Sequence, residues 1–166
     1  VRDYLRSTAV ESAAITFEDD RGLRAHIRTV SMSSGGSAAF TRFSSSDSAI
    51  VDMGVTVNEP VPGLDLVCIL SNATGAVLLE EHMSDGPSQT ISAPGRYTVR
   101  CTIPPVLPPG DYIVGILLGT HYELIDAREN VVTFSVDGDD LGRPRRMFKL
   151  GLQWRAERTD DSLDPP

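Results

Sequence analysis

The sequence contains no long hydrophobic run, only two cysteines and a single tryptophan. A membrane-spanning helix needs roughly 18 to 20 consecutive apolar residues, and no stretch of the chain approaches that length. The first residues also lack the basic stretch followed by an apolar stretch that marks a secretion signal. We therefore expect a soluble chain that does not target itself to a membrane.

Basic residues are also scarce, because 15 Lys and Arg stand against 23 Asp and Glu, giving a formal net charge of −8. A protein that binds nucleic acid needs a concentrated basic surface to displace the counterions of the phosphates. The composition therefore argues against nucleic acid and against anionic lipid headgroups as partners.

Motifs for common enzyme chemistries are absent. A nucleotide-binding loop ends in Gly-Lys followed by Ser or Thr, whereas Gly35 and Gly36 lie between serines and no lysine follows them. The Gly-x-Ser-x-Gly elbow of serine hydrolases does not occur either. The sequence predicts no nucleotide hydrolysis, no catalytic residue and no cofactor.

Cys68 and Cys101 each lie within an alternating apolar stretch, where a thiol behaves as a small buried hydrophobe. Without a secretion signal, two such cysteines favour free thiols in a reducing compartment. A disulfide between neighbouring strands is the alternative.

The chain does contain many short stretches rich in Val, Ile, Leu, Thr and Tyr, separated by Gly, Pro, Asn, Asp and Ser. Such a pattern is typical of strands joined by tight turns. We predict one all-β domain, an immunoglobulin-like or jelly-roll antiparallel sandwich, over residues 26–155. Residues 1–25 are expected to form a linker or short helix, and residues 156–166 a disordered tail. The expected strands, about eight in number, cover residues 26–33, 49–57, 64–71, 77–81, 96–103, 111–119, 131–136 and 148–155.

Alternation of side chains assigns the two faces of each strand. In one strand Tyr97, Val99, Cys101 and Ile103 are predicted to face the core, and Arg96, Thr98, Arg100 and Thr102 to face outward. In the next, Tyr112, Val114, Ile116 and Leu118 are predicted to face inward.

Several glycines and apolar residues fall on outward faces. A glycine there weakens a strand and often marks the close approach of a ligand or another backbone, and exposed apolar area favours a covering partner. We therefore expect one outer sheet surface to be occupied. The alternative is that the glycines mark bulges and that the apolar residues pack under the N-terminal segment. The outward residues are Gly54, Gly115, Gly119, Gly151, Val67, Ile69, Ile113 and Leu117.

Two local clusters contain residue types used in catalysis. His121, Glu123 and Asp126 could bind a metal or flank a glycosidic bond, but one short loop supplies few ligands, and a polar loop rim is the preferred interpretation. Glu80, Glu81 and His82 are interpreted as a solvated strand end. Trp154 is a residue type that stacks on sugars, yet its alternation with Phe148, Leu150 and Leu152 favours a core or interface position.

The run LPPGDYIVGILLG, the strand VVTFSV and a Gly-rich turn leading to LGLQW follow one another in that order. This succession resembles the C-terminal domain of Wzt-type ABC exporter ATPases, in which a Pro-Gly turn introduces an alternating strand and the last strand ends in tryptophan. The segment LVCILSNATGAVL resembles the family too, although Val67 stands where glycine is common and Asn72 where aspartate is. The resemblance covers most of residues 25–154. The matching positions are Gly110, Tyr112, Val114, Ile116 and Trp154.

The resemblance implies a sandwich that dimerises through its terminal strand and recognises a completed O-antigen polysaccharide before export. It places the domain in the cytoplasm, at the inner membrane, with ATP hydrolysis in a missing upstream domain. The segment VRDYL would belong to the connector from that domain, and the transporter's membrane subunit would be a partner of the full-length protein. A dimerisation or protein-interaction sandwich without glycan binding is the alternative, and a small catalytic or metal-dependent lectin-like domain is a third.

The residues themselves suggest where a glycan would bind. We predict that it lies across an outward face formed by the strands carrying residues 52–56, 98–102 and 113–119. Arg100 is the strongest candidate, because its guanidinium presents a rigid fork of donors to hydroxyls or to an anionic group. The loop with His121 and Tyr122 is the second location, and no metal ligand is assigned. The predicted ligand-binding residues are Asp52, Thr56, Thr98, Arg100, Gly115, Gly119, His121 and Tyr122.

Overall fold

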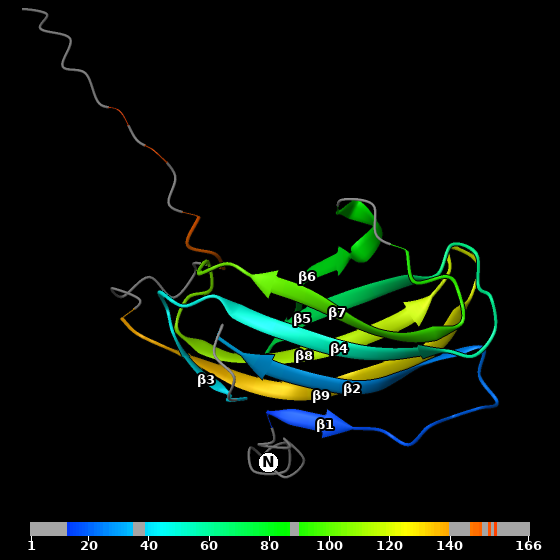
Figure 1. Ribbon diagram of the computed structural model, residues 1–166. Coiled ribbons are helices and arrows are strands. Elements are labelled where there is room, and N and C mark those ends of the chain that lie inside the picture. The colour runs from blue at the N-terminus through cyan, green and yellow to red at the C-terminus, as the bar shows by residue number, and fades with distance from the viewer. Residues whose placement is uncertain are drawn as a thin grey trace, which may run out of the picture.

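The computed structural model describes residues 13–34, 39–86, 90–139, 147–150, 153 and 155. These residues form two β-sheets packed face to face, with a single turn of 3-10 helix, η1 (Met83–Asp85), between two strands (Figure 1). The predicted all-β sandwich is confirmed.

The first sheet has four strands in the order β1-β2-β4-β7, and the second has five in the order β3-β9-β8-β5-β6. The pairs are antiparallel except for β3 and β9, which run parallel. The first sheet comprises β1 (Ala14–Thr16), β2 (Ala25–Ser33), β4 (Ala49–Val57) and β7 (Gly95–Ile103). The second comprises β3 (Arg42–Ser44), β5 (Asp65–Asn72), β6 (Val77–His82), β8 (Gly110–Gly119) and β9 (Leu124–Asp137).

The connections identify the type of sandwich. The connections β1–β2, β5–β6 and β8–β9 stay within one sheet, whereas the chain crosses between sheets after β2, β3, β4, β6 and β7. Such crossings are those of an immunoglobulin-like sandwich. β7 and β6 are edge strands of the two sheets, and they lie on the same side of the sandwich.

The inward faces of both sheets form one hydrophobic core, as the alternation predicts. Tyr112, Val114, Ile116 and Leu118 of β8 are buried, while Val99 and Ile103 are the buried residues of β7. Arg96, Thr98, Arg100 and Thr102 are exposed, and Tyr97 and Cys101 are half-buried. Burial of these apolar side chains provides the main driving force for the fold.

Tyr112 closes the corner that precedes β8. Its hydroxyl donates a hydrogen bond of 2.6 Å to the carbonyl of Pro108, and its ring stacks on Phe134 with centroids 5.4 Å apart. A tyrosine near the start of this strand that bonds back to the upstream backbone is the tyrosine corner of immunoglobulin-like domains. Tyr97 makes a similar bond, of 2.7 Å, to Ala93 at the start of β7, but at a more exposed position.

The strand predictions differ from the structure at the two ends of the chain and in β9. Residues 13–25, expected to be linker, contribute β1 and the start of β2, and the predicted strand 131–136 is the second half of the longer β9. β1 and β3 were not predicted, because three residues are too few to show alternation. In the predicted strand 148–155, residues 148–150 are not in a strand, and Gly151, Leu152 and Trp154 lie outside the described residues, as does the 156–166 tail.

Candidate functional site

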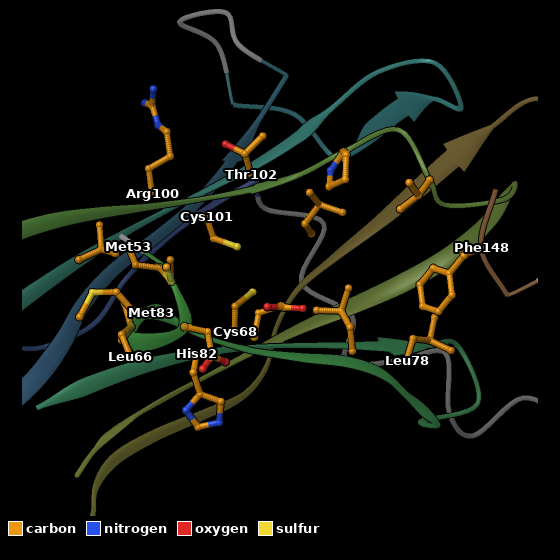
Figure 2. Close-up of a pocket in the computed structure, with 18 of the residues that line it drawn as sticks. Met53, Leu66, Cys68, Leu78, His82, Met83, Arg100, Cys101, Thr102 and Phe148 are labelled. Atoms are coloured by element: carbon orange, nitrogen blue, oxygen red, sulfur yellow. The ribbon is translucent and has the colours of Figure 1, made fainter. Parts of the chain in front are cut away.

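A groove with a volume of about 710 Å³ opens between the edge strands β6 and β7 (Figure 2). It forms because the two sheets end on this side of the sandwich with no further strand between them among the described residues. Its floor is apolar, with Met53, Leu66 and Val99 from three different strands. The groove is therefore an opening into the hydrophobic core at the sandwich edge.

Polar groups lie around the groove. Glu81 pairs with Cys68 across β6 and β5, so that both side chains lie on the inner face of the second sheet. Arg100 and Thr102 line the β7 border, but their side chains point away from the groove, as does His82 on β6 (Figure 2). The half-buried ring of Phe148 lies at one end. A ligand in the groove would therefore meet apolar surface below and the Glu81 carboxylate at the β6 border.

Cys68 and Cys101 face each other from the two sheets, and their side chains point into the groove (Figure 2). Both are free thiols in this structure. Their strands are not neighbours, because β5 lies in the second sheet and β7 at the edge of the first. The alternative prediction placed a disulfide between neighbouring strands, and it is wrong because these two strands are not neighbours.

The structure brings together four of the predicted ligand-binding residues. Asp52 lies opposite Arg100, and Thr98 and Thr56 follow on the same outward face of β7 and β4. Arg100 donates from Nε and from a terminal nitrogen to the two oxygens of Asp52, at 2.7 and 2.9 Å. This bond raises the pKa of the Arg100 guanidinium above its ordinary value. Arg100 is thus a permanently charged donor with a fixed orientation, and two of its N–H groups are bonded to Asp52.

Gly115 and Gly119 do not belong to that face. They lie on β8 in the second sheet, so their outward side is the opposite surface of the sandwich. The prediction that residues 52–56, 98–102 and 113–119 form one face is therefore wrong. Alternation shows which side of a strand faces the core, but it does not show to which sheet the strand belongs.

The outward glycines are explained by neighbouring protein atoms. A methyl group at Gly119 would overlap the carbonyl oxygen of Glu123, and one at Gly54 would overlap the hydroxyl of Thr29. Gly54 lies opposite a register shift in β2, and Gly115 lies within a register shift between β8 and β9. These positions support the interpretation that the glycines accompany bulges and close backbone contacts.

The outward apolar residues of the second sheet are partly covered. Val67 is buried, and Ile69, Ile113 and Leu117 are half-buried. The described part of the N-terminal segment cannot cover them, because β1 joins the first sheet. Residues 1–12, which the alternative also invokes, lie outside the described residues.

The predicted cluster of His121, Glu123 and Asp126 is divided in the structure. His121 and Tyr122 lie on the exposed turn between β8 and β9, with their rings edge to face at 5.3 Å. Glu123 forms an ion pair with Arg24. Asp126 is buried and accepts a 2.8 Å hydrogen bond from the N–H of Ile27, which links β9 of the second sheet to β2 of the first. Asp126 is therefore a structural residue.

In the second cluster, Glu80, Glu81 and His82, the histidine ring bonds to Asp65 on the neighbouring strand β5. Nδ1 of His82 lies 3.0 Å from Oδ2 of Asp65, and the hydroxyl of Ser84 donates to the same oxygen at 2.7 Å. Hydrogen bonding to Asp65 raises the pKa of His82. Burial alone would raise the pKa of Asp65, but the hydrogen bonds from Ser84 and His82 outweigh it, so the pKa is lowered.

Among the residues that the structure describes, no group of three or more His, Cys, Asp or Glu side chains could hold a metal ion. None of the described helices is long and apolar enough to span a membrane.

The fold and the groove define an immunoglobulin-like sandwich with an open edge. The family model described as "Wzt C-terminal domain" matches residues 21–147, and the chain belongs to this family. A search of curated proteins gives no significant match.

Among solved structures, the chain is similar to the crystal structure of the C-terminal domain of Wzt, with a TM-score of 0.66 and 15% identity over 81% of this chain and 84% of that one. At this identity the likeness supports the fold alone. A β-glucosidase from Listeria innocua in complex with glucose aligns with a TM-score of 0.39 and 15% identity, over 66% of this chain and 16% of that one. That score is too low to support an argument.

Sequence reasoning missed the groove and its residues Glu81, Met53 and Phe148. Glu81 was interpreted as part of a solvated strand end, and it is exposed. It nevertheless lies directly opposite Cys68 in the paired strand, which places its side chain on the inner face of the sheet. The pairing of β5 with β6 was the signal available. That β6 and β7 lie across the groove from each other depends on how the two sheets pack, which the pattern of a single strand does not show.

Proposed function

We propose that the chain is a non-catalytic polysaccharide-binding domain and that O-antigen polysaccharide binds in the groove between β6 and β7. The observation that supports this most directly is the groove itself. Its volume of about 710 Å³ lies within the roughly 300–1,000 Å³ typical of small-ligand sites. Its apolar floor and the carboxylate of Glu81 complement a sugar ring, which has C–H faces and hydroxyl edges.

The described residues suggest a path for the sugar chain. Phe148 offers an aromatic surface for a C–H face, and the carboxylate of Glu81 accepts hydrogen bonds from hydroxyls. A chain that leaves the groove over the edge of β7 would then reach Arg100, whose guanidinium carries about five N–H donors, two of them directed at Asp52. Thr98 and Thr102 flank Arg100 on the same exposed face. This path retains the predicted site on β4 and β7 and omits Gly115 and Gly119.

The family suggests the setting of this binding. We propose that the domain acts in the cytoplasm, at the inner membrane, as part of a longer subunit of an ABC transporter for lipopolysaccharide O-antigen. In that subunit an upstream domain hydrolyses ATP and the whole protein contacts the membrane subunit. We further propose that two copies of the domain associate.

A protein-interaction sandwich without glycan binding is the second candidate. The half-buried residues Ile69, Ile113 and Leu117 on the outward face of the second sheet favour it, because such a surface suits a protein partner. The two candidates predict different responses to polysaccharide.

The test is calorimetric titration of the chain with O-polysaccharide purified from the strain that encodes it, with an unrelated polysaccharide as the control ligand. Glu81→Ala and Phe148→Ala should each weaken binding on the order of tenfold, since each removes a hydrogen bond or a stacking surface. The matched control Tyr122→Ala, on the β8–β9 turn, should bind as the parent does. Loss of binding in Tyr122→Ala alone would move the site to that turn. No binding by the folded parent would favour the interaction sandwich.

A further inference from the structure

The two cysteines line the groove from opposite sheets. Cys68 is 2% exposed on β5, whereas Cys101 on β7 is half-buried and accessible from the groove. Both side chains line the groove, and their sulfur atoms point toward each other across the space between the sheets (Figure 2). Two thiols from opposite sheets therefore meet where the sandwich is open.

The environment makes the two thiols unequal. The hydrogen bond with Cys68 lowers the pKa of Cys101 to about 7, against the opposing effects of burial and of the Glu81 carboxylate. The same hydrogen bond, together with burial, raises the pKa of Cys68. Because the thiolate is the nucleophile in thiol chemistry, Cys101 is the attacking group near neutral pH and Cys68 is its protonated neighbour.

The position of β7 permits the two sulfurs to come closer. A disulfide requires Cα atoms about 4.4–6.8 Å apart, whereas facing sheets are separated by about 10 Å. β7 pairs with β4 alone among the described strands, so it can move toward β5 without breaking a second ladder. That movement would narrow the groove at Met53 and Leu66, which line it beside the thiols.

We propose that Cys101 and Cys68 form a redox-active pair that a low-molecular-weight disulfide, such as oxidised glutathione, converts into an inter-sheet disulfide that narrows the groove. The Cys101 thiolate attacks one sulfur of the oxidant, forms a mixed disulfide and releases one glutathione thiolate. Cys68 then loses its proton and attacks the Cys101 sulfur, which releases the second glutathione. The protein loses two hydrogens, and the oxidant is reduced to two thiols.

The inference rests on the geometry of the groove and does not depend on which ligand fills it. Its test treats the 166-residue chain with oxidised glutathione at pH 7.5 and follows the intact mass under non-reducing conditions. The parent should lose two hydrogens and retain no adduct. Cys68→Ser should accumulate one glutathionyl group on Cys101, because the resolving thiol is missing, and Cys101→Ser should remain unmodified.

A second measurement separates thiol chemistry from a loss of structure. The rate of alkylation of Cys101 by iodoacetamide should rise through a midpoint near pH 7 in the parent. In Cys68→Ala the midpoint should move to higher pH, because the hydrogen bond that stabilises the thiolate is gone. A stable glutathionyl adduct on the parent, or a midpoint that Cys68→Ala leaves in place, would overturn the proposal.

Discussion

The guanidinium of Arg100 and the carboxylate of Asp52 lie directly opposite each other on β7 and β4 and share two hydrogen bonds of 2.7 and 2.9 Å. Asp52 is the less exposed partner, with 23% of its side chain accessible against 62% for Arg100. The carboxylate therefore holds the guanidinium in one orientation at the border of the groove. A donor whose orientation is fixed loses less conformational entropy when it binds a ligand.

Asp52→Asn tests this orienting role. The amide keeps the shape of the carboxylate but removes its charge and one acceptor, so the Arg100 fork is no longer held. We expect polysaccharide affinity to fall on the order of threefold to tenfold, with little change in the urea midpoint of unfolding. The matched control Asp111→Asn, which removes an exposed carboxylate of the second sheet bonded to Ser135, should leave affinity unchanged. Equal affinity for the parent and Asp52→Asn would contradict the orienting role.

Gly119 and Gly115 offer a matched pair of substitutions on β8. A methyl group at Gly119 would overlap the backbone of Glu123, which cannot move without disturbing the β8–β9 hairpin. At Gly115 the same methyl group would lie 3.6 Å from the carbonyl oxygen of Arg128, an ordinary contact. Gly119→Ala should therefore lower the free energy of unfolding by about 1–3 kcal/mol, and Gly115→Ala should change it by less than about 1 kcal/mol. Urea unfolding of both variants measures the difference, and equal values would be inconsistent with the observed packing.

The tyrosine corner predicts the outcome of a second pair of substitutions. Tyr112→Phe removes the hydroxyl that bonds Pro108 at a buried position and leaves that carbonyl without its donor. We expect a loss of about 1–2 kcal/mol in the free energy of unfolding. Tyr97→Phe removes a bond of similar length to Ala93 at a more exposed position, where water can replace it, and should cost less than half as much. If the two losses are equal in thermal unfolding, burial does not determine the value of this hydrogen bond.

The Asp65–His82 pair makes stability depend on pH in two windows. The pKa of Asp65 is lowered from 3.8, so its contribution is present above that pH and is lost as the pH falls through the lower folded value. The pKa of His82 is raised from 6.5, so its contribution is present below that pH and is lost as the pH rises through the higher folded value. Between these two limits both contributions are present.

His82→Gln should therefore remove part of the loss of stability between pH 5.5 and pH 8. The His82 side chain is 41% exposed, so solvent screening limits the effect to less than about 1 kcal/mol. Urea unfolding at both pH values measures it, with His121→Gln on the exposed β8–β9 turn as the control. A pH difference that persists in full in His82→Gln would show that other groups are responsible.

The sequence predicted the strands and their buried sides well, because alternation is a local property. Tyr112, Val114 and Leu118 are buried as expected, and Arg96, Thr98 and Arg100 face outward. Which strands share a sheet depends on long-range pairing, so β8 was wrongly joined to β4 and β7 in one face. Glycine positions were recognised, but Gly119 is required by the carbonyl of Glu123 in its own hairpin. The groove depends on how the two sheet edges face each other and was not predictable from any single strand.

The buried carboxylate of Asp126 limits how the two sheets can move against each other. It binds the N–H of Ile27 on the side of the sandwich where β9 and β2 meet, whereas β6 and β7 lie at the opposite margin. Sliding of one layer over the other would break this bond inside the core, at a cost of about 1–3 kcal/mol for the unsatisfied amide. The Asp126–Ile27 bond therefore fastens the two layers to each other on the side of the sandwich away from the groove.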